Sequence, residues 1–163
     1  MKEAVTTWSL EMISPTQLVH KPIPSPDFVI HECREKHFAF NRFLYSYVGQ
    51  LWQWTDKLVW SDEQWRDYAE NDNLRLWVGY CNGSPAGYFE LQKNDTDVEI
   101  AYFGLAGSFI GRGFGGALLS AAISEAWNWG AKRVWVHTCT LDHPHALQNY
   151  QSRGLQIFRE ETH

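Results

Sequence analysis

Apolar positions in the N-terminal third of the chain recur with the period of an amphipathic helix. Between Phe40 and Leu51 they occupy positions i, i+3, i+4, i+7, i+8 and i+11, which places them on one helix face. Ser61 is followed three residues later by Gln64, a capping-box pattern, so a second helix is predicted to begin there and to reach about Asn71. The Trp-rich segment between the two helices fits no regular period.

Strand-like apolar runs flank this helical pair and recur through the second half of the chain. Two of these runs are joined by Asn82-Gly83-Ser84-Pro85, which predicts a β-hairpin. Prolines concentrated between Ser14 and Asp27 predict an irregular connector near the N-terminus. The predicted strands are residues 4–12, 28–33, 74–81, 86–93, 98–105, 134–138 and 155–160.

Two further helices are predicted after the strand that ends near residue 105. The first begins at Gly113, is apolar on one face, and is ended by Gly130. The second begins at Pro144, because proline suits the first turn of a helix, with Asp142 or His143 as its cap.

Composition indicates a globular domain with a high aromatic content. The 163 residues are predicted to form a single domain, residues 1–163, in which 44% are apolar and 20% are charged. The net charge of −5 argues against nucleic-acid binding and favours a small cationic or amine substrate. The nine tryptophans exceed what core filling alone requires.

The cysteines and the N-terminus bear on the cellular location. Cys33, Cys81 and Cys139 form no CxxC pair and are odd in number, so no disulfide framework is expected. The first residues lack the apolar core of a signal peptide, and no run approaches the length of a membrane span. These features predict a soluble cytoplasmic protein without a membrane partner.

The segment from Val98 to Gly116 carries the clearest chemical pattern. A predicted strand passes through a loop of small residues into Gly111, Gly113 and Gly116, which open an apolar helix. Such a helix start aims main-chain N–H groups and the positive end of the helix dipole into open space. The pattern therefore predicts a phosphate or pyrophosphate site.

A dinucleotide-binding fold is disfavoured, although the three glycines match its G-x-G-x-x-G fingerprint. That fingerprint requires an acidic residue about 20 positions further on, at the end of the next strand. Here the next strand ends at Val136-His137-Thr138, without a carboxylate, and an antiparallel hairpin precedes the motif. No Lys-Ser or Lys-Thr pair follows the glycines, which excludes a P-loop.

In their context, these residues resemble the GCN5-related N-acetyltransferase (GNAT) family. The family's core motif consists of Arg or Gln, two residues, Gly, one residue, and then Gly or Ala. Residues 110–115, IGRGFG, are similar to this motif, and an apolar helix follows them. Residues 99–105 resemble the family's fourth strand, and residues 143–155 resemble its Asn-Pro-x-Ala…Tyr-x-x-x-Gly-Phe motif. The resemblance covers about residues 74–157 in the expected order.

The resemblance implies an α/β (α+β) fold: a central mixed, mostly antiparallel sheet of about six to seven strands with helices on both faces. The fourth and fifth strands are parallel and splay apart, and acetyl-CoA lies in the gap. The coenzyme pyrophosphate would rest on N–H groups of residues 112–116, and the pantetheine arm would pair with nearby strand backbone. The implied coenzyme-binding residues are Phe103, Leu105, Ala106, Gly107, Gly111, Arg112, Gly113, Phe114, Gly115, Gly116, His143 and Tyr150.

Several positions depart from the family pattern. Ile110 replaces the usual Arg or Gln, and Gly107 stands where Pro is frequent. His143 replaces Asn, and Leu155 replaces Phe. None of these changes removes a main-chain donor, so we expect coenzyme binding to survive.

The end of the sheet also departs from the family pattern. The chain ends soon after the strand that begins at Leu155, where the family typically has another strand. We expect Ala4–Met12 to fill this vacant edge, or else a second subunit in a homodimer.

Two side chains are candidates for the chemistry of acetyl transfer, which needs a neutral amine and a proton for the leaving thiolate. Tyr150 matches the family's general acid, and we expect its phenol to have a pKa near the ordinary value. The alternative is a tyrosine that packs on the coenzyme without proton transfer. Glu99 matches the catalytic glutamate of the histone-acetylating branch, or else is a solvated charge. Glu90, on the neighbouring strand, is the reserve candidate.

His137, Cys139, His143 and His145 cluster in the sequence, but their spacing matches no closed zinc site. The alternative has His137 and Cys139 partly buried and His143 beside the coenzyme. We predict no metal on this basis.

The acceptor side of the site is predicted from the tryptophans between the first two helices, where the family forms its acceptor wall. Trp52, Trp54, Trp60 and Trp65 form either an aromatic box for a cation or a flat ring, or hydrophobic packing under a loop. The predicted substrate-binding residues are Trp52, Trp54, Tyr88 and Glu90.

Two functions remain open from the sequence. The first is an acetyl-CoA-dependent N-acetyltransferase that acts on a primary amine of a small molecule or peptide. The second is a non-catalytic acyl-CoA-binding sensor or interaction module with the same fold. Tyr150 and Glu99 favour the enzyme, whereas the changes at Ile110 and His143 leave room for the sensor.

Overall fold

The computed structural model describes residues 4–163. Its strands are β1 (Thr6–Met12), β2 (Phe28–Glu32), β3 (Leu74–Cys81), β4 (Ser84–Asn94), β5 (Asp97–Leu105), β6 (Arg133–Cys139) and β7 (Gln156–Thr162). Its helices are α1 (Phe38–Gly49), α2 (Asp62–Ala69), α3 (Phe114–Asn128) and α4 (Ala146–Ser152), with 3-10 turns η1 (Pro15–Gln17) and η2 (Gly107–Phe109). Each strand and helix predicted from the sequence is present.

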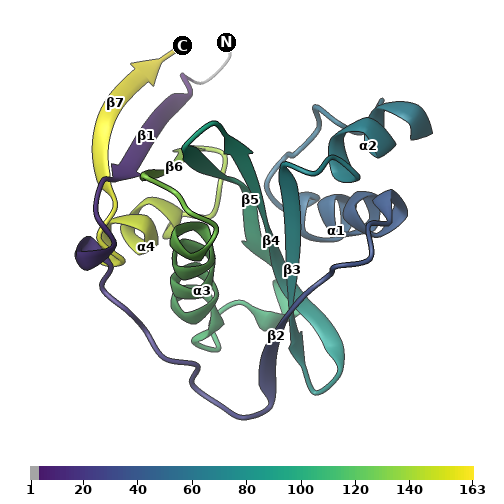
Figure 1. Cartoon of the computed structure of the whole chain (residues 1–163), viewed down its shortest axis with the longest axis horizontal. Coiled ribbons are helices and arrows are strands. Elements are labelled where there is room, and N and C mark those ends of the chain that lie inside the picture. Colours follow the sequence, from purple (N-terminus) through teal and green to yellow (C-terminus); the bar gives the residue numbers. More distant parts are fainter. Residues whose placement is uncertain (1–3) are drawn as a thin grey trace.

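All seven strands form one sheet, in the order β2-β3-β4-β5-β6-β1-β7. Only the β5–β6 pair is parallel, and every other neighbouring pair is antiparallel. Helices α3 and α4 lie on one side of the sheet, and α1 and α2 lie on the other (Figure 1). The predicted fold class, a mixed and mostly antiparallel sheet with helices on both faces, is confirmed.

The parallel strands β5 and β6 separate after a short paired stretch. Asp97–Glu99 pairs with Arg133–Trp135, and the register ends there. Further along, β5 remains bonded to β4, and β6 remains bonded to β1. The two strands therefore diverge in the middle of the sheet and leave main-chain groups without a strand partner between them.

The N-terminal strand β1 lies inside the sheet rather than at its edge. It pairs with β6 on one side and with β7 on the other, and the side chains of Leu10 and Met12 are fully buried. The expectation that this segment fills a vacant edge was therefore wrong in its position, because β7 itself forms the edge. The alternation along β1 suits this placement: the buried Leu10 and Met12 face the core, and both edges of the strand are hydrogen-bonded to other strands.

The two capping predictions have different outcomes. Ser61 and Gln64 form the predicted capping box at the start of α2. Helix α4 begins at Ala146, two residues later than predicted. The Asp142 carboxylate instead accepts the main-chain N–H of Cys139, and His143 Nδ1 accepts the N–H of His145, so neither side chain caps the helix.

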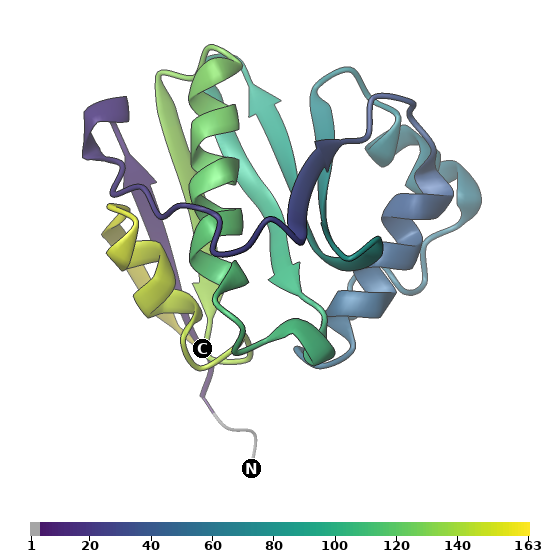
Figure 2. The ribbon, with the colours of Figure 1, turned by 90° about the horizontal axis from the view of Figure 1, so that it is seen from below.

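Two apolar clusters hold the helices on the sheet. The larger cluster lies between the sheet and α3 and α4, and the smaller one packs α1 against β3 and β4 through Leu44, Val48 and Val78. The connector between β1 and β2 crosses the outer side of α3 (Figure 2). Among the helices within residues 4–163, none combines the length and the apolarity that a membrane crossing requires.

Candidate active site

A cavity of about 870 Å³ opens where β5 and β6 separate. Its walls come from the second half of β5, the end of β6, the loop between α1 and α2, and helix α4. One end of the cavity reaches the start of α3, at Gly115 and Gly116. The cavity therefore connects a helix N-terminus with the gap in the sheet.

The start of α3 presents unsatisfied main-chain donors. Gly113 is the N-cap, with a φ of 85° in the left-handed region, and its lack of a side chain makes this conformation accessible. No side chain caps the helix, so the N–H groups of its first turn have no intrahelical partner. These donors and the helix dipole create a site for an anion.

Two cationic side chains converge on the same helix start. Both side chains lie against Gly116 in the first turn of α3: a Cβ atom added to this glycine would lie 2.5 Å from Lys21 Cδ and 3.2 Å from Arg153 Nη1. The N–H of Lys21 donates to Ser120 Oγ at 2.8 Å, which fixes the connector over α3 as Figure 2 shows. Arg153 Nε is buried and has no hydrogen-bond partner within residues 4–163. Lys21 and Arg153 thus add positive charge at the first turn of α3.

Lys21 and Arg153 were not predicted from the sequence as site residues. Lys21 lies in an irregular connector, and only the fold brings it next to a helix that begins far along the chain. The position of Arg153 beside Gly154 of the motif was the only available signal for it.

The side chains of the glycine loop point away from the anion site. The guanidinium of Arg112 contacts Cys81 Sγ at 3.5 Å and lies 5.2 Å from the ring of Phe114. Phe114 itself is buried and stacks on Phe28 with ring centroids 4.3 Å apart. Neither Arg112 nor Phe114 lines the cavity, so we expect both residues to contact the coenzyme through the main chain.

The backbone of β5 offers hydrogen-bonding groups to the gap. The N–H of Ala106 donates to Ala86 on β4, at 2.8 Å. Because alternate residues of a strand direct their main-chain groups to opposite sides, those of Phe103 and Leu105 are directed toward the gap. Both residues line the cavity, whereas Ala106 is buried and Gly107 begins a 3-10 turn.

Tyr150 lies at the cavity wall with its ring edge-on to Phe103, centroids 6.0 Å apart. Burial raises the pKa of Tyr150 well above the usual value for a phenol, and the negative charge of Asp142 raises it further. This differs from the ordinary pKa expected from the sequence, because the side chain, which α4 carries, is buried. Burial therefore favours the protonated phenol, which is the form that a proton donor needs.

Glu99 lies at the point where β5 and β6 part. A carboxylate oxygen of Glu99 is 3.5 Å from Nδ1 of His137 on β6. The hydrogen bond to Glu99 raises the pKa of His137, although burial partly opposes it. Both side chains line the cavity, so an acid–base pair is available at its centre.

Glu90 and Tyr88 are more deeply placed than the sequence analysis expected. Both are buried and neither lines the cavity. The Glu90 carboxylate accepts hydrogen bonds from Asn41 Nδ2 and from the Tyr68 hydroxyl, each at 2.7 Å. Burial raises the pKa of Glu90, while these two donors oppose the shift. Glu90 therefore acts on the cavity only through Tyr68 and its charge.

The loop between α1 and α2 reaches across the gap. The indole N–H of Trp54 donates to Asp142 at 3.5 Å, and Trp52 packs edge-on against His143 with centroids 5.1 Å apart. These contacts join the acceptor side of the cavity to the segment between β6 and α4. Trp60 and Trp65 pack together further from the gap.

The His and Cys residues near β6 do not form a metal centre. Among residues 4–163, no three His, Cys, Asp or Glu side chains are grouped closely enough to hold a metal ion. His137 instead faces Glu99, and the three cysteines carry free thiols.

The chain has relatives whose sequences and folds are known. Residues 31–155 match the model of the acetyltransferase (GNAT) family. Uncharacterised N-acetyltransferases of Mycobacterium bovis and Mycobacterium tuberculosis are 25% identical over 108 residues, which cover 63% of this chain and 69% of theirs.

Solved structures share the fold at low sequence identity. A GCN5-related N-acetyltransferase from Kribbella flavida has a TM-score of 0.69 and 16% identity, over 95% of this chain and 55% of that one. An aminoglycoside acetyltransferase from an uncultured soil metagenomic sample, in complex with sisomicin, has a TM-score of 0.66 and 14% identity, over 78% of this chain and 87% of that one. The chain thus spans only about half the length of the Kribbella protein. Since the family model covers most of the sequence, the chain belongs to the GNAT family of acetyltransferases.

Proposed function

We propose that the chain is an acetyl-CoA-dependent N-acetyltransferase that acetylates a primary amine of a small molecule or peptide by direct attack in a ternary complex. The observation that carries this proposal is the cavity between β5 and β6, which joins strand main-chain groups to the uncapped start of α3. This arrangement suits a long ligand that has amides in its middle and phosphates at one end.

The residues present fit coenzyme A. The N–H groups at the start of α3, together with Lys21 and Arg153, would hold the pyrophosphate. The main-chain groups of Phe103 and Leu105 would pair with the pantetheine amides. The unpartnered Nε of Arg153 supports this fit, because a buried guanidinium nitrogen without an acceptor is unfavourable until an anion satisfies it.

Two of the chain's own groups would manage the protons. When bound, the coenzyme supplies an activated thioester, at which the amine nitrogen forms a C–N bond as the C–S bond breaks. Glu99 would take the proton that the amine loses, directly or through water, with His137 beside it. Tyr150, held protonated by burial, would give a proton to the departing thiolate.

The experiment is a thiol-release assay with acetyl-CoA across a panel of primary amines, with Tyr150→Phe as the control variant. Amine-dependent thiol release that falls in the variant supports the transferase. Coenzyme binding without turnover on any amine would support the sensor instead. The homodimer, the cytoplasmic location and the single-domain organisation remain predictions.

A further inference from the structure

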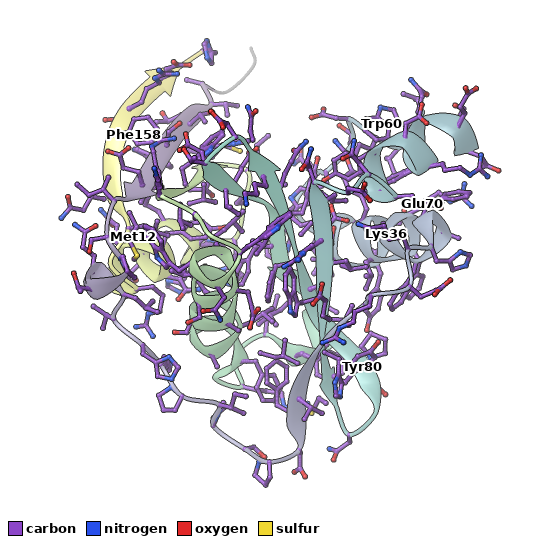
Figure 3. The ribbon with its side chains drawn as sticks, viewed as in Figure 1. Met12, Lys36, Trp60, Glu70, Tyr80 and Phe158 are labelled. Carbon is purple, nitrogen blue, oxygen red and sulfur yellow. The ribbon has the colours of Figure 1, made fainter. Side chains whose placement is uncertain are left out.

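Three aromatic rings surround the ammonium group of Lys57, in the loop between α1 and α2. Lys57 Nζ lies 4.3 Å from the ring centroid of Trp60, 4.9 Å from that of Tyr68 and 5.0 Å from that of Tyr102. Trp60, labelled in Figure 3, lies beside α2. Such distances allow each ring face to attract the cation.

A buried carboxylate completes this arrangement. Glu90 accepts a hydrogen bond from Tyr68, and its negative charge acts on the ammonium of Lys57. We refer to Trp60, Tyr68, Tyr102 and Glu90 as the ammonium box. Aromatic faces combined with a buried carboxylate are the chemistry that recognises an organic cation.

Two residues of the ammonium box, Tyr68 and Tyr102, line the cavity that contains the coenzyme slot, whereas Trp60 and Glu90 do not. Lys57, Tyr68 and Tyr102 line the cavity that also contains Phe103 and Tyr150. Tyr102 precedes Phe103 directly on β5, so its side chain is on the opposite face of the strand from that of Phe103. The box therefore lies on the α1 and α2 side of the slot.

Lys57 is held loosely enough to leave the box. Its loop neighbours Leu58 and Val59 are 58% and 88% exposed, so this part of the loop lies at the surface, although Trp54 packs on the smaller apolar cluster. The backbone N–H of Lys57 donates to the Tyr45 hydroxyl at 3.1 Å, a bond that a movement of the side chain does not break. Within residues 4–163, the Lys57 ammonium makes no hydrogen bond or ion pair like those that fix Arg133 on β6.

We propose that the ammonium box binds the alkylammonium group of the acceptor, and that Lys57 is a resident occupant which the acceptor must displace. This inference rests on the proposed transferase function and narrows its substrate class. Because the unbranched stem of Lys57 carries its ammonium into the box, we expect the ligand to be an unbranched primary alkylamine. It binds as its ammonium and must give a proton to Glu99, directly or through water, before its nitrogen can attack the thioester. Two ammonium groups cannot share the box, since their charges repel each other at this distance.

The test measures binding of n-pentylammonium chloride to the coenzyme-free chain by isothermal titration calorimetry. Lys57→Ala is expected to bind it about tenfold more tightly than the wild type. Lys132→Ala, which removes an exposed lysine at the start of β6, is the matched control and should bind like the wild type. Lys57→Ala should not change the affinity of the chain for uncharged n-pentanol.

A second variant protects the test from a folding artefact. If Lys57→Ala fails to melt cooperatively, Lys57→Gln keeps most of the stem and removes the charge. Trp60→Leu, added to either variant, should abolish the gain in affinity. Equal affinity in the wild type and the Lys57 variants, or an equal gain for n-pentanol, would overturn the proposal. Since no coenzyme is present, a failure of acetyl-CoA binding would count only against the transferase function.

Discussion

Nδ1 of His137 lies 3.5 Å from a carboxylate oxygen of Glu99, across the point where the two parallel strands separate. Glu99 belongs to the last paired position of β5 and β6, whereas His137 lies two positions beyond it on β6. Both side chains line the cavity that we propose for acetyl transfer. The titration of this pair is therefore open to direct measurement.

The pKa of His137 should fall toward its ordinary value of about 6.5 in Glu99→Gln, because the variant loses the charged partner that raises it. Histidine NMR titration of both proteins measures this shift. The stabilisation from the contact is fully present below the unfolded-state pKa and is lost as pH rises through the higher folded-state pKa. The difference in free energy of unfolding between the wild type and Glu99→Gln should therefore shrink as the pH rises through the folded-state pKa of His137. An unchanged titration of His137 would contradict the contact.

Tyr150→Phe should lower kcat, because it removes the only hydroxyl proposed to protonate the thiolate and leaves the ring in place. A loss of about 100-fold or more is typical of a general acid. The KM for acetyl-CoA should change little, since the ring contact with Phe103 remains. Steady-state kinetics separate the two effects, and an unchanged kcat would assign Tyr150 a packing role instead.

Lys21→Ala and Arg153→Gln should each weaken coenzyme A binding about tenfold, because each removes a charged partner of the pyrophosphate. The losses should shrink at high salt, as expected for an electrostatic contact. Calorimetric titration with coenzyme A gives the dissociation constants, and Lys132→Ala serves as the exposed-lysine control. If both variants bind as tightly as the wild type, the main-chain donors of α3 act alone.

Leu10→Ala should destabilise the fold by about 2–5 kcal/mol, because the side chain is fully buried in the interior strand β1. Ile13→Ala, just beyond the strand, should change the unfolding free energy by less than about 0.5 kcal/mol, since that side chain is 65% exposed. Urea denaturation measures both values. Deletion of residues 1–12 should prevent cooperative folding, and a melting curve like that of the wild type would refute the placement of β1.

Local patterns in the sequence were sufficient to predict the elements, because each pattern reflects a local physical requirement. The capping box of Ser61 and Gln64 and the left-handed Gly113 are decided within one turn of chain. The start of α4 was mispredicted because Asp142 bonds back to the end of β6 instead of capping the helix. Such competition between partners depends on the tertiary fold.

The candidate site was predicted less completely. Tyr88 and Glu90 were predicted to bind the substrate, but both are buried, because the period of a strand does not reveal that α1 and α2 cover this part of β4. Lys21 could not be found because its contact with α3 joins distant parts of the chain. The tryptophans near Lys57 were interpreted either as a cation box or as hydrophobic packing, and a role of Lys57 as occupant could be inferred only from the three-dimensional distances.

The position of β1 also has a consequence for biosynthesis. Thr6 and Thr162, which lie on adjacent strands and are hydrogen-bonded, are 156 positions apart. Strand β1 leaves the ribosome before β6 and β7 and must wait for them before it can pair, and contacts of such long sequence separation slow folding. During that wait the apolar side of β1 lacks its native cover, so we expect nascent chains to need protection from aggregation until β7 has been synthesised.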